Sequence, residues 1–133
     1  MVYLFTHNDL DGVSCGILAK LAYGENAEIS YNSVGSLDHQ VRRHLEKGEK
    51  EGRVIITDLS IHSENEQLMD KFVEGGGEAY LIDHHKSALH LNDHSWGQVT
   101  VEKDGVLTSA TSLFYEFLLT KGEIEKNQTI DEY

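Results

Sequence analysis

The chain has 133 residues, of which 39% are hydrophobic and 26% charged, as expected for one modest domain with its own core. Its 23 acidic and 11 basic residues give a formal net charge of −12, which argues against nucleic-acid binding through a broad basic surface. The one cysteine, Cys15, excludes an internal disulfide and a thiolate zinc cluster.

Short apolar runs alternate with longer amphipathic stretches, which is typical of an α/β fold. The runs predict strands at residues 2–5, 28–32, 54–57, 79–82 and 97–101. The amphipathic stretches predict helices at residues 12–23, 37–47, 63–74 and 109–120. In the first helix, the spacing predicts a buried face that consists of Val13, Ile17, Leu18 and Leu21.

This order of elements predicts a Rossmann-like three-layer domain with a mainly parallel central sheet of about five strands. We expect residues 1–121 to form this domain, and residues 122–133 to be a polar tail or the start of a truncated next helix. No apolar stretch reaches the length of a signal-peptide core or a membrane span. A cytoplasmic protein without a membrane partner is therefore expected.

Acidic and histidine side chains follow three of the predicted strands. They are His7, Asp9, Asp11, Asp58, Asp83, His84 and His85. Ligands of open α/β sheets bind outside the carboxyl ends of the strands, where these residues are expected to meet. Each has an ordinary alternative explanation; Asp11, for example, would serve as the cap of a helix that begins near Gly12. Their recurrence at three strand ends favours one shared metal site.

Converging carboxylates repel one another by roughly a few kcal/mol per close pair, and a pair of divalent cations removes this repulsion. Nitrogen and oxygen ligands without thiolates suit manganese, iron, cobalt, zinc or magnesium. The sequence contains no EF-hand loop, no His-Glu-x-x-His helix and no glycine-rich phosphate loop with lysine. The remaining histidines have no carboxylate companions at a strand end and are interpreted as surface residues, although His94 lies near the predicted site: His39, His44, His62, His90 and His94.

The order of these motifs resembles that of the DHH phosphoesterases. Asp9-x-Asp11-Gly12, then Asp58 after an apolar strand, then Asp83-His84-His85 are similar to the first three motifs of that superfamily. The superfamily includes RecJ-type exonucleases, nano-RNases, cyclic-dinucleotide phosphodiesterases and manganese-dependent pyrophosphatases. Residues 108–111 are also similar to its small-residue turn, and the resemblance extends over residues 2–119.

The resemblance implies a role for each motif residue. Asp58 would bridge two metal ions, Asp9 would bind one of them, and Asp11 and His84 would bind the other. His85 would contact the substrate phosphate as a catalytic residue, and Asp83 would be a ligand or would orient a histidine. Many members carry a histidine four residues before the first aspartate, where this chain has Phe5. His7 is therefore a metal-ligand candidate because of its position in the chain, and not because of the family register.

The function that the resemblance implies is phosphodiester or phosphomonoester hydrolysis, with a phosphorylated small molecule or a short single-stranded nucleic acid as substrate. The implied cofactors are two divalent metal ions, with Mn²⁺ preferred and Mg²⁺ or Co²⁺ as alternatives. The family's fourth aspartate and its second, substrate-binding domain are missing, and Asp131 is a poor substitute. We therefore expect the N-terminal part of a longer enzyme or a natural minimal version, with a homodimer left open.

Two other functional classes are alternatives to this enzyme. The first is a metal- or nucleotide-binding module without turnover, because the missing fourth aspartate would leave the second metal site incomplete. The second is a response-regulator-like signalling domain, which also has acidic residues at strand ends. This last alternative does not explain His84 and His85.

Overall fold

The computed structural model describes residues 2–47, 52–59, 61 and 63–123. Five strands form a central sheet in the order β2-β1-β3-β4-β5, and each neighbouring pair is parallel. The strands are β1 (Val2–His7), β2 (Ala27–Asn32), β3 (Arg53–Thr57), β4 (Glu78–Asp83) and β5 (Gly97–Val99). The predicted α/β fold with a five-stranded parallel sheet is confirmed.

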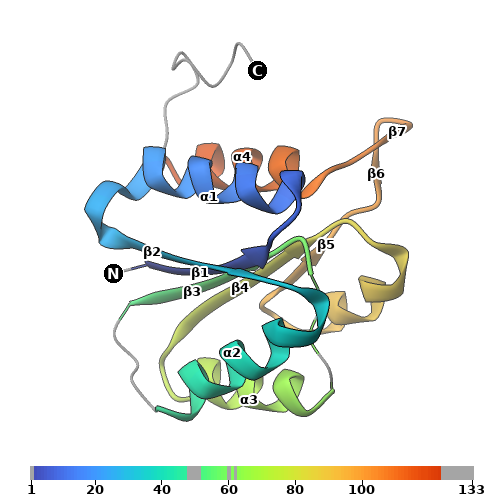
Figure 1. Cartoon of the computed structure of the whole chain (residues 1–133). Helices are drawn as coiled ribbons and strands as arrows, with labels where there is room; N and C mark the ends of the chain where they lie inside the picture. The colour runs from blue at the N-terminus through green and yellow to red at the C-terminus, as the bar shows by residue number, and fades with distance from the viewer. Residues whose placement is uncertain (1, 48–51, 60, 62, 124–133) are drawn as a thin grey trace.

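Four α-helices cover the two faces of this sheet, α1 and α4 on one side and α2 and α3 on the other (Figure 1). Their bounds are α1 (Leu10–Tyr23), α2 (Val34–Glu46), α3 (Ser63–Glu74) and α4 (Ala110–Thr120). Two short 3₁₀ segments are η1 (Gly24–Asn26) and η2 (Lys86–Asp93). The hydrophobic core has two parts, one on each face of the sheet. None of the described helices is long and apolar enough to cross a membrane.

The strand order places a topological switch point between β1 and β3. From β1 the chain passes to one neighbour, β2, and then crosses to the other neighbour, β3. Helices therefore leave the carboxyl ends of β1 and β3 toward opposite faces of the sheet, and ligands of open α/β sheets bind at such a point. The residues that follow these two strands are the first candidates for a binding site.

The buried face of α1 differs from the predicted one. Val13, Ile17 and Leu21 are 36%, 56% and 59% exposed, and only Leu18 of the predicted set lies in the core. The buried face instead consists of Gly12, Cys15, Gly16, Leu18 and Ala19. Small side chains let the helix lie close to the sheet and to α4, so this face packs in spite of its lower hydrophobicity.

The region after β5 also differs in detail from the prediction. The fifth strand ends at Val99, and residues 102–107 form a hairpin of β6 (Glu102–Lys103) and β7 (Val106–Leu107). Asp104 and Gly105 both have positive φ, as expected for a two-residue hairpin turn. The last helix ends at Thr120, and most of the predicted polar tail, residues 124–133, lies outside the described residues. The proposed domain boundary at residue 121 stays a prediction.

Candidate metal centre

The start of α1 lies directly against the end of β1 and brings His7 beside Asp9. The side chain of Asp9 caps the helix, because it accepts a hydrogen bond of 2.9 Å from the backbone N–H of Gly12. A Cβ atom at residue 12 would lie 1.9 Å from the carbonyl oxygen of His7, so only glycine allows this approach. His7 Nδ1 then lies 3.0 Å from Asp9 Oδ2. The cap of α1 is thus Asp9 and not Asp11.

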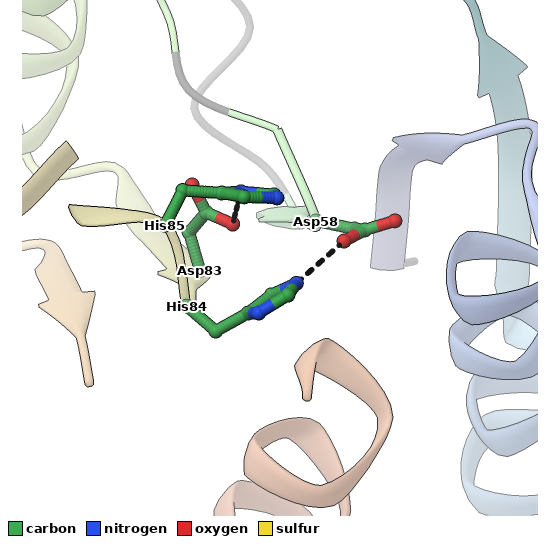
Figure 2. Close-up of side chains that lie close together, drawn as sticks. All are labelled: Asp58, Asp83, His84 and His85. Atoms are coloured by element: carbon green, nitrogen blue, oxygen red, sulfur yellow. Dashed lines mark hydrogen bonds and ion pairs between the residues drawn. The ribbon is translucent and has the colours of Figure 1, made fainter. Parts of the chain in front are cut away.

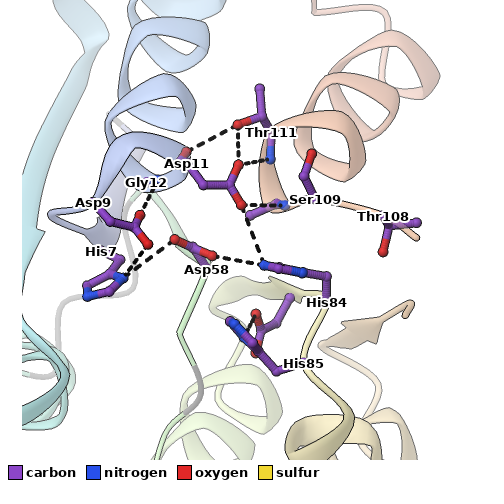
Figure 3. A network of polar contacts seen from close by, with 12 residues as sticks. His7, Asp9, Asp11, Gly12, Asp58, His84, His85, Thr108, Ser109 and Thr111 are labelled. Atoms are coloured by element: carbon purple, nitrogen blue, oxygen red, sulfur yellow. Dashed lines mark hydrogen bonds and ion pairs between the residues drawn. The ribbon is translucent and has the colours of Figure 1, made fainter. Parts of the chain in front are cut away.

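Asp58 follows β3 and lies at the centre of the cluster (Figure 3). Its backbone has a φ of 66°, a left-handed conformation that is unusual for a residue other than glycine. The side chain is 2% exposed. Its Oδ1 lies 3.1 Å from His84 Nε2, and its Oδ2 lies 3.6 Å from His7 Nδ1.

The environment of Asp58 disfavours its charged form. Burial is the largest cause, and the nearby carboxylates of Asp9, Asp11 and Asp83 add to it. Together they raise the pKa of Asp58 to about 8. Among the described residues, no group donates a hydrogen bond to Asp58 Oδ2 or to Asp83 Oδ2, and both atoms are buried. Buried carboxylate oxygens without donors are costly, and a bound cation would remove that cost.

The Asp83-His84-His85 segment ends β4, and its two imidazoles point to different carboxylates (Figure 2). His84 approaches Asp58, while His85 Nδ1 lies 2.7 Å from Oδ1 of Asp83, which is fully buried. The two rings lie against each other, with 4.2 Å between their centroids. Asp83 therefore fixes the orientation of His85, and Asp58 fixes that of His84.

Asp11 points toward the N-terminus of α4, about a hundred residues further along the chain. Its Oδ2 accepts a hydrogen bond of 3.0 Å from Ala110 N, and its Oδ1 accepts one of 2.9 Å from Thr111 N and another from the Thr111 hydroxyl. Burial raises the pKa of Asp11, but the hydrogen bonds from Thr111 and Ala110 outweigh it and lower the pKa overall. Asp11 Oδ2 also lies 3.5 Å from His84 Nε2.

The residue types and distances fit divalent metal ions. Two groups of side chains have potential ligand atoms within 4.8 Å of one another, and Asp58 belongs to both. The groups are Asp58, Asp83, His84 and His85, and His7, Asp9 and Asp58. Asp11 belongs to neither group, but its Oδ2 lies 3.5 Å from Nε2 of His84, which belongs to the first group. Carboxylate oxygens and imidazole nitrogens at this spacing suit manganese, magnesium, zinc or cobalt.

Two features of the structure did not follow from the sequence. The first is the contact of Asp11 with Thr111, although residues 108–111 had been identified as a small-residue turn. The second is the environment of His94, which the sequence predicts to be a surface residue. Its side chain is only 23% exposed and lies 2.9 Å from both Asp70 and Glu66 of α3, and His90 lies 3.8 Å from Glu66. His62 lies outside the described residues.

Comparison with known proteins finds similarities in sequence and in fold. The chain is 51% identical over 137 residues to the Bacillus subtilis (strain 168) protein named oligoribonuclease NrnB; the match covers all of this chain and 34% of that protein. The chain thus spans about a third of the length of this curated relative. An uncharacterized protein from Helicobacter pylori G27 has a similar fold, with a TM-score of 0.75 and 22% identity over 90% of this chain and 36% of the other. No protein-family model matches the chain.

Proposed function

We propose that the chain is the metal-binding domain of a DHH-type phosphoesterase that hydrolyses short RNA oligonucleotides. The observation that carries the proposal is Asp58, a buried carboxylate with a raised pKa that belongs to both groups of potential metal ligands. The order of the aspartate and histidine motifs supports the family, and the similarity to a protein named oligoribonuclease supports the substrate.

The side-chain geometry suggests how two divalent ions, with Mn²⁺ preferred and Mg²⁺ or Co²⁺ as alternatives, would be held. Asp58 would bridge them. His7 and Asp9 would complete one site, and His84, Asp83 and the Oδ2 atom of Asp11 would complete the other. Asp11 Oδ1 would stay with Thr111, so that the carboxylate links the metal site to α4.

His85 is proposed to act on the substrate phosphate. When bound, the two ions would neutralise the phosphate oxygens and lower the pKa of water. The His85 side chain is 49% exposed, and its Nδ1 is occupied by Asp83, which leaves Nε2 available to a ligand. Asp83 would accept from Nδ1–H and fix the ring orientation. The doubly protonated, imidazolium form of His85 would then donate from Nε2–H to the oxygen on which negative charge develops.

The substrate-binding part of the enzyme is proposed to lie elsewhere in a longer protein. The chain corresponds to about a third of its relative, and the family resemblance implies a fourth aspartate and a second domain. The binding module without turnover is less favoured, because the similar protein is named as a ribonuclease.

Hydrolysis of a 5′-labelled RNA pentamer by the full-length protein that contains this chain, with and without Mn²⁺, tests this proposal, with Asp58→Asn as the matched variant. Asparagine preserves the size of the side chain and tolerates positive φ, so the fold is expected to remain. We expect Mn²⁺-dependent cleavage by the natural sequence and its loss in the variant. Mn²⁺ should also raise the melting temperature of the natural sequence, and less so that of the variant. Equal cleavage by both proteins would contradict the proposal, as would no cleavage at saturating Mn²⁺.

A further inference from the structure

A groove separate from the metal centre lies between the edge strand β2 and helix α2. Its volume is about 410 Å³, within the range of roughly 300–1,000 Å³ that is usual for small-molecule sites. We call it the α2 groove and define it by the side chains of Tyr3, Phe5, Ser30, Gln40, Arg43 and Lys47. The β1–β2 register pairs Tyr3 with Glu28 and Phe5 with Ser30, and these residues form its floor.

Among the described residues, no acid forms an ion pair with the two cations of the α2 groove. Arg42 contacts Glu46 and Glu64, whereas neither Arg43 nor Lys47 makes an ion pair within the described part of the chain. Of the described residues that line the groove, Glu28 is the one acid. Two cations with a single acid among the described lining residues are unusual in a chain with a net charge of −12, and they favour the binding of an anion in this groove.

The rest of the lining suits an aromatic ligand with hydrogen-bonding groups. The His44 ring lies 4.4 Å from the Tyr3 ring and 5.5 Å from the Phe5 ring, measured between centroids, which gives the groove an aromatic wall. The Gln40 amide and the Ser30 hydroxyl add donors and acceptors. Aromatic side chains stack with nucleobases, and arginine binds phosphate through two parallel hydrogen bonds.

We propose that the α2 groove binds a nucleoside monophosphate. The phosphate would lie against Arg43 and Lys47, and the base against the aromatic wall. Phe5 and Tyr3 lie two and four residues before His7 on β1, about 7 and 13 Å along the strand, and none of the described lining residues belongs to the metal centre. The proposed binding therefore needs neither metal ions nor any residue of the metal centre, and it stands apart from the proposed hydrolysis.

Calorimetric titration of the 133-residue chain in EDTA tests the proposal, with AMP, GMP, CMP and UMP as separate ligands. EDTA removes the metal ions, so the carboxylates at the strand ends repel phosphate and leave the groove as the expected site. We expect at least one nucleotide to bind with a stoichiometry of one. Arg43→Gln should weaken this binding about tenfold or more, because it removes a charge-assisted hydrogen bond to phosphate.

Arg42→Gln is the matched control, since Arg42 is the adjacent residue on the same helix but does not line the groove. It should leave the dissociation constant unchanged. Adenosine and inorganic phosphate, titrated separately, should each bind more weakly than AMP. The proposal would be overturned by no binding at millimolar nucleotide, by equal losses in Arg42→Gln and Arg43→Gln, or by adenosine or phosphate binding as tightly as AMP.

Discussion

His84 and His85 are adjacent in sequence but are held by different carboxylates, and this difference predicts different roles. His84 contacts Asp58 and Asp11, whereas His85 contacts Asp83. We expect His84→Ala to lose bound metal. His85→Ala should keep the metal content. It should lower kcat by about a hundredfold, because the variant lacks a side chain that donates to the reacting phosphate. Metal analysis and turnover of the two purified variants measure both effects, and equal metal loss in both would contradict these roles.

Thr111 is expected to position Asp11. Its hydroxyl and backbone N–H both donate to the Asp11 carboxylate, and Thr111→Val removes only the hydroxyl at nearly constant volume. The free energy of unfolding should fall by about 1 kcal/mol, measured by urea denaturation, because one partly buried hydrogen bond is lost. If Asp11 is a metal ligand, the affinity for Mn²⁺ should fall too.

Two further variants show whether this effect is specific. Thr111→Ser restores the hydroxyl and should restore both the stability and the Mn²⁺ affinity. Thr120→Val changes an exposed threonine at the other end of α4 and should leave the stability within about 0.5 kcal/mol. An unchanged Mn²⁺ affinity in Thr111→Val would contradict the positioning role, and would show that Thr111 contributes to stability alone.

At the level of elements, the strands were predicted from the sequence more accurately than the buried face of helix α1. Strands that are buried on both sides, such as β3 and β4, are continuous apolar runs and are identified easily. Helix α1 has apolar residues on more than one side, so periodicity favoured Ile17 and Leu21, which are exposed. Its packed face depends on Gly12 and Gly16, and only the positions of β1 and β2 show that small residues are required there.

The His94 ring joins α3 to the segment between η2 and β5. Its Nδ1 lies 2.9 Å from Asp70 and its Nε2 lies 2.9 Å from Glu66, so both nitrogens must carry protons in order to donate. The ring also stacks on Trp96, whose indole N–H donates to Asp70. Partial burial lowers the pKa of His94, but the two carboxylates outweigh it and raise the pKa overall.

A pH-dependent contribution to stability follows from this contact. A histidine with a raised pKa in the folded state stabilises the fold fully below its ordinary value of about 6.5, and the effect is lost as the pH rises through the raised pKa. We expect His94→Gln to lower the free energy of unfolding by about 1 kcal/mol at pH 6 and by less at pH 9. Urea denaturation at the two pH values measures this difference.

His90→Gln is the control for this titration, because His90 is 59% exposed and lies 3.8 Å from Glu66. It should change the stability little at either pH. A loss in His94→Gln that is the same at pH 6 and pH 9 would show that the ring acts through packing on Trp96 and not through its charge.

At the level of the whole molecule, the place of the candidate site followed from the sequence because the sheet is parallel. Parallel strands end at one edge, so residues that follow β1, β3 and β4 meet there. The partners of each side chain did not follow, since contacts such as that of Asp11 with Thr111 depend on how α4 packs against α1. The left-handed backbone of Asp58 likewise has no signal in the sequence.

The net charge of −12 predicts an unusual salt dependence for the proposed RNA hydrolysis. Proteins that bind nucleic acid through basic surfaces lose affinity as salt rises. Here the acidic surface repels the substrate, and raising the ionic strength from about 10 to about 150 mM shortens the screening length from about 30 to about 8 Å. At saturating Mn²⁺ we expect kcat/KM for an RNA pentamer to rise with salt. The kcat/KM for bis(p-nitrophenyl) phosphate, which carries one negative charge, should change less with salt. A steep fall of kcat/KM with rising salt for RNA alone would contradict this prediction and would indicate a basic binding surface.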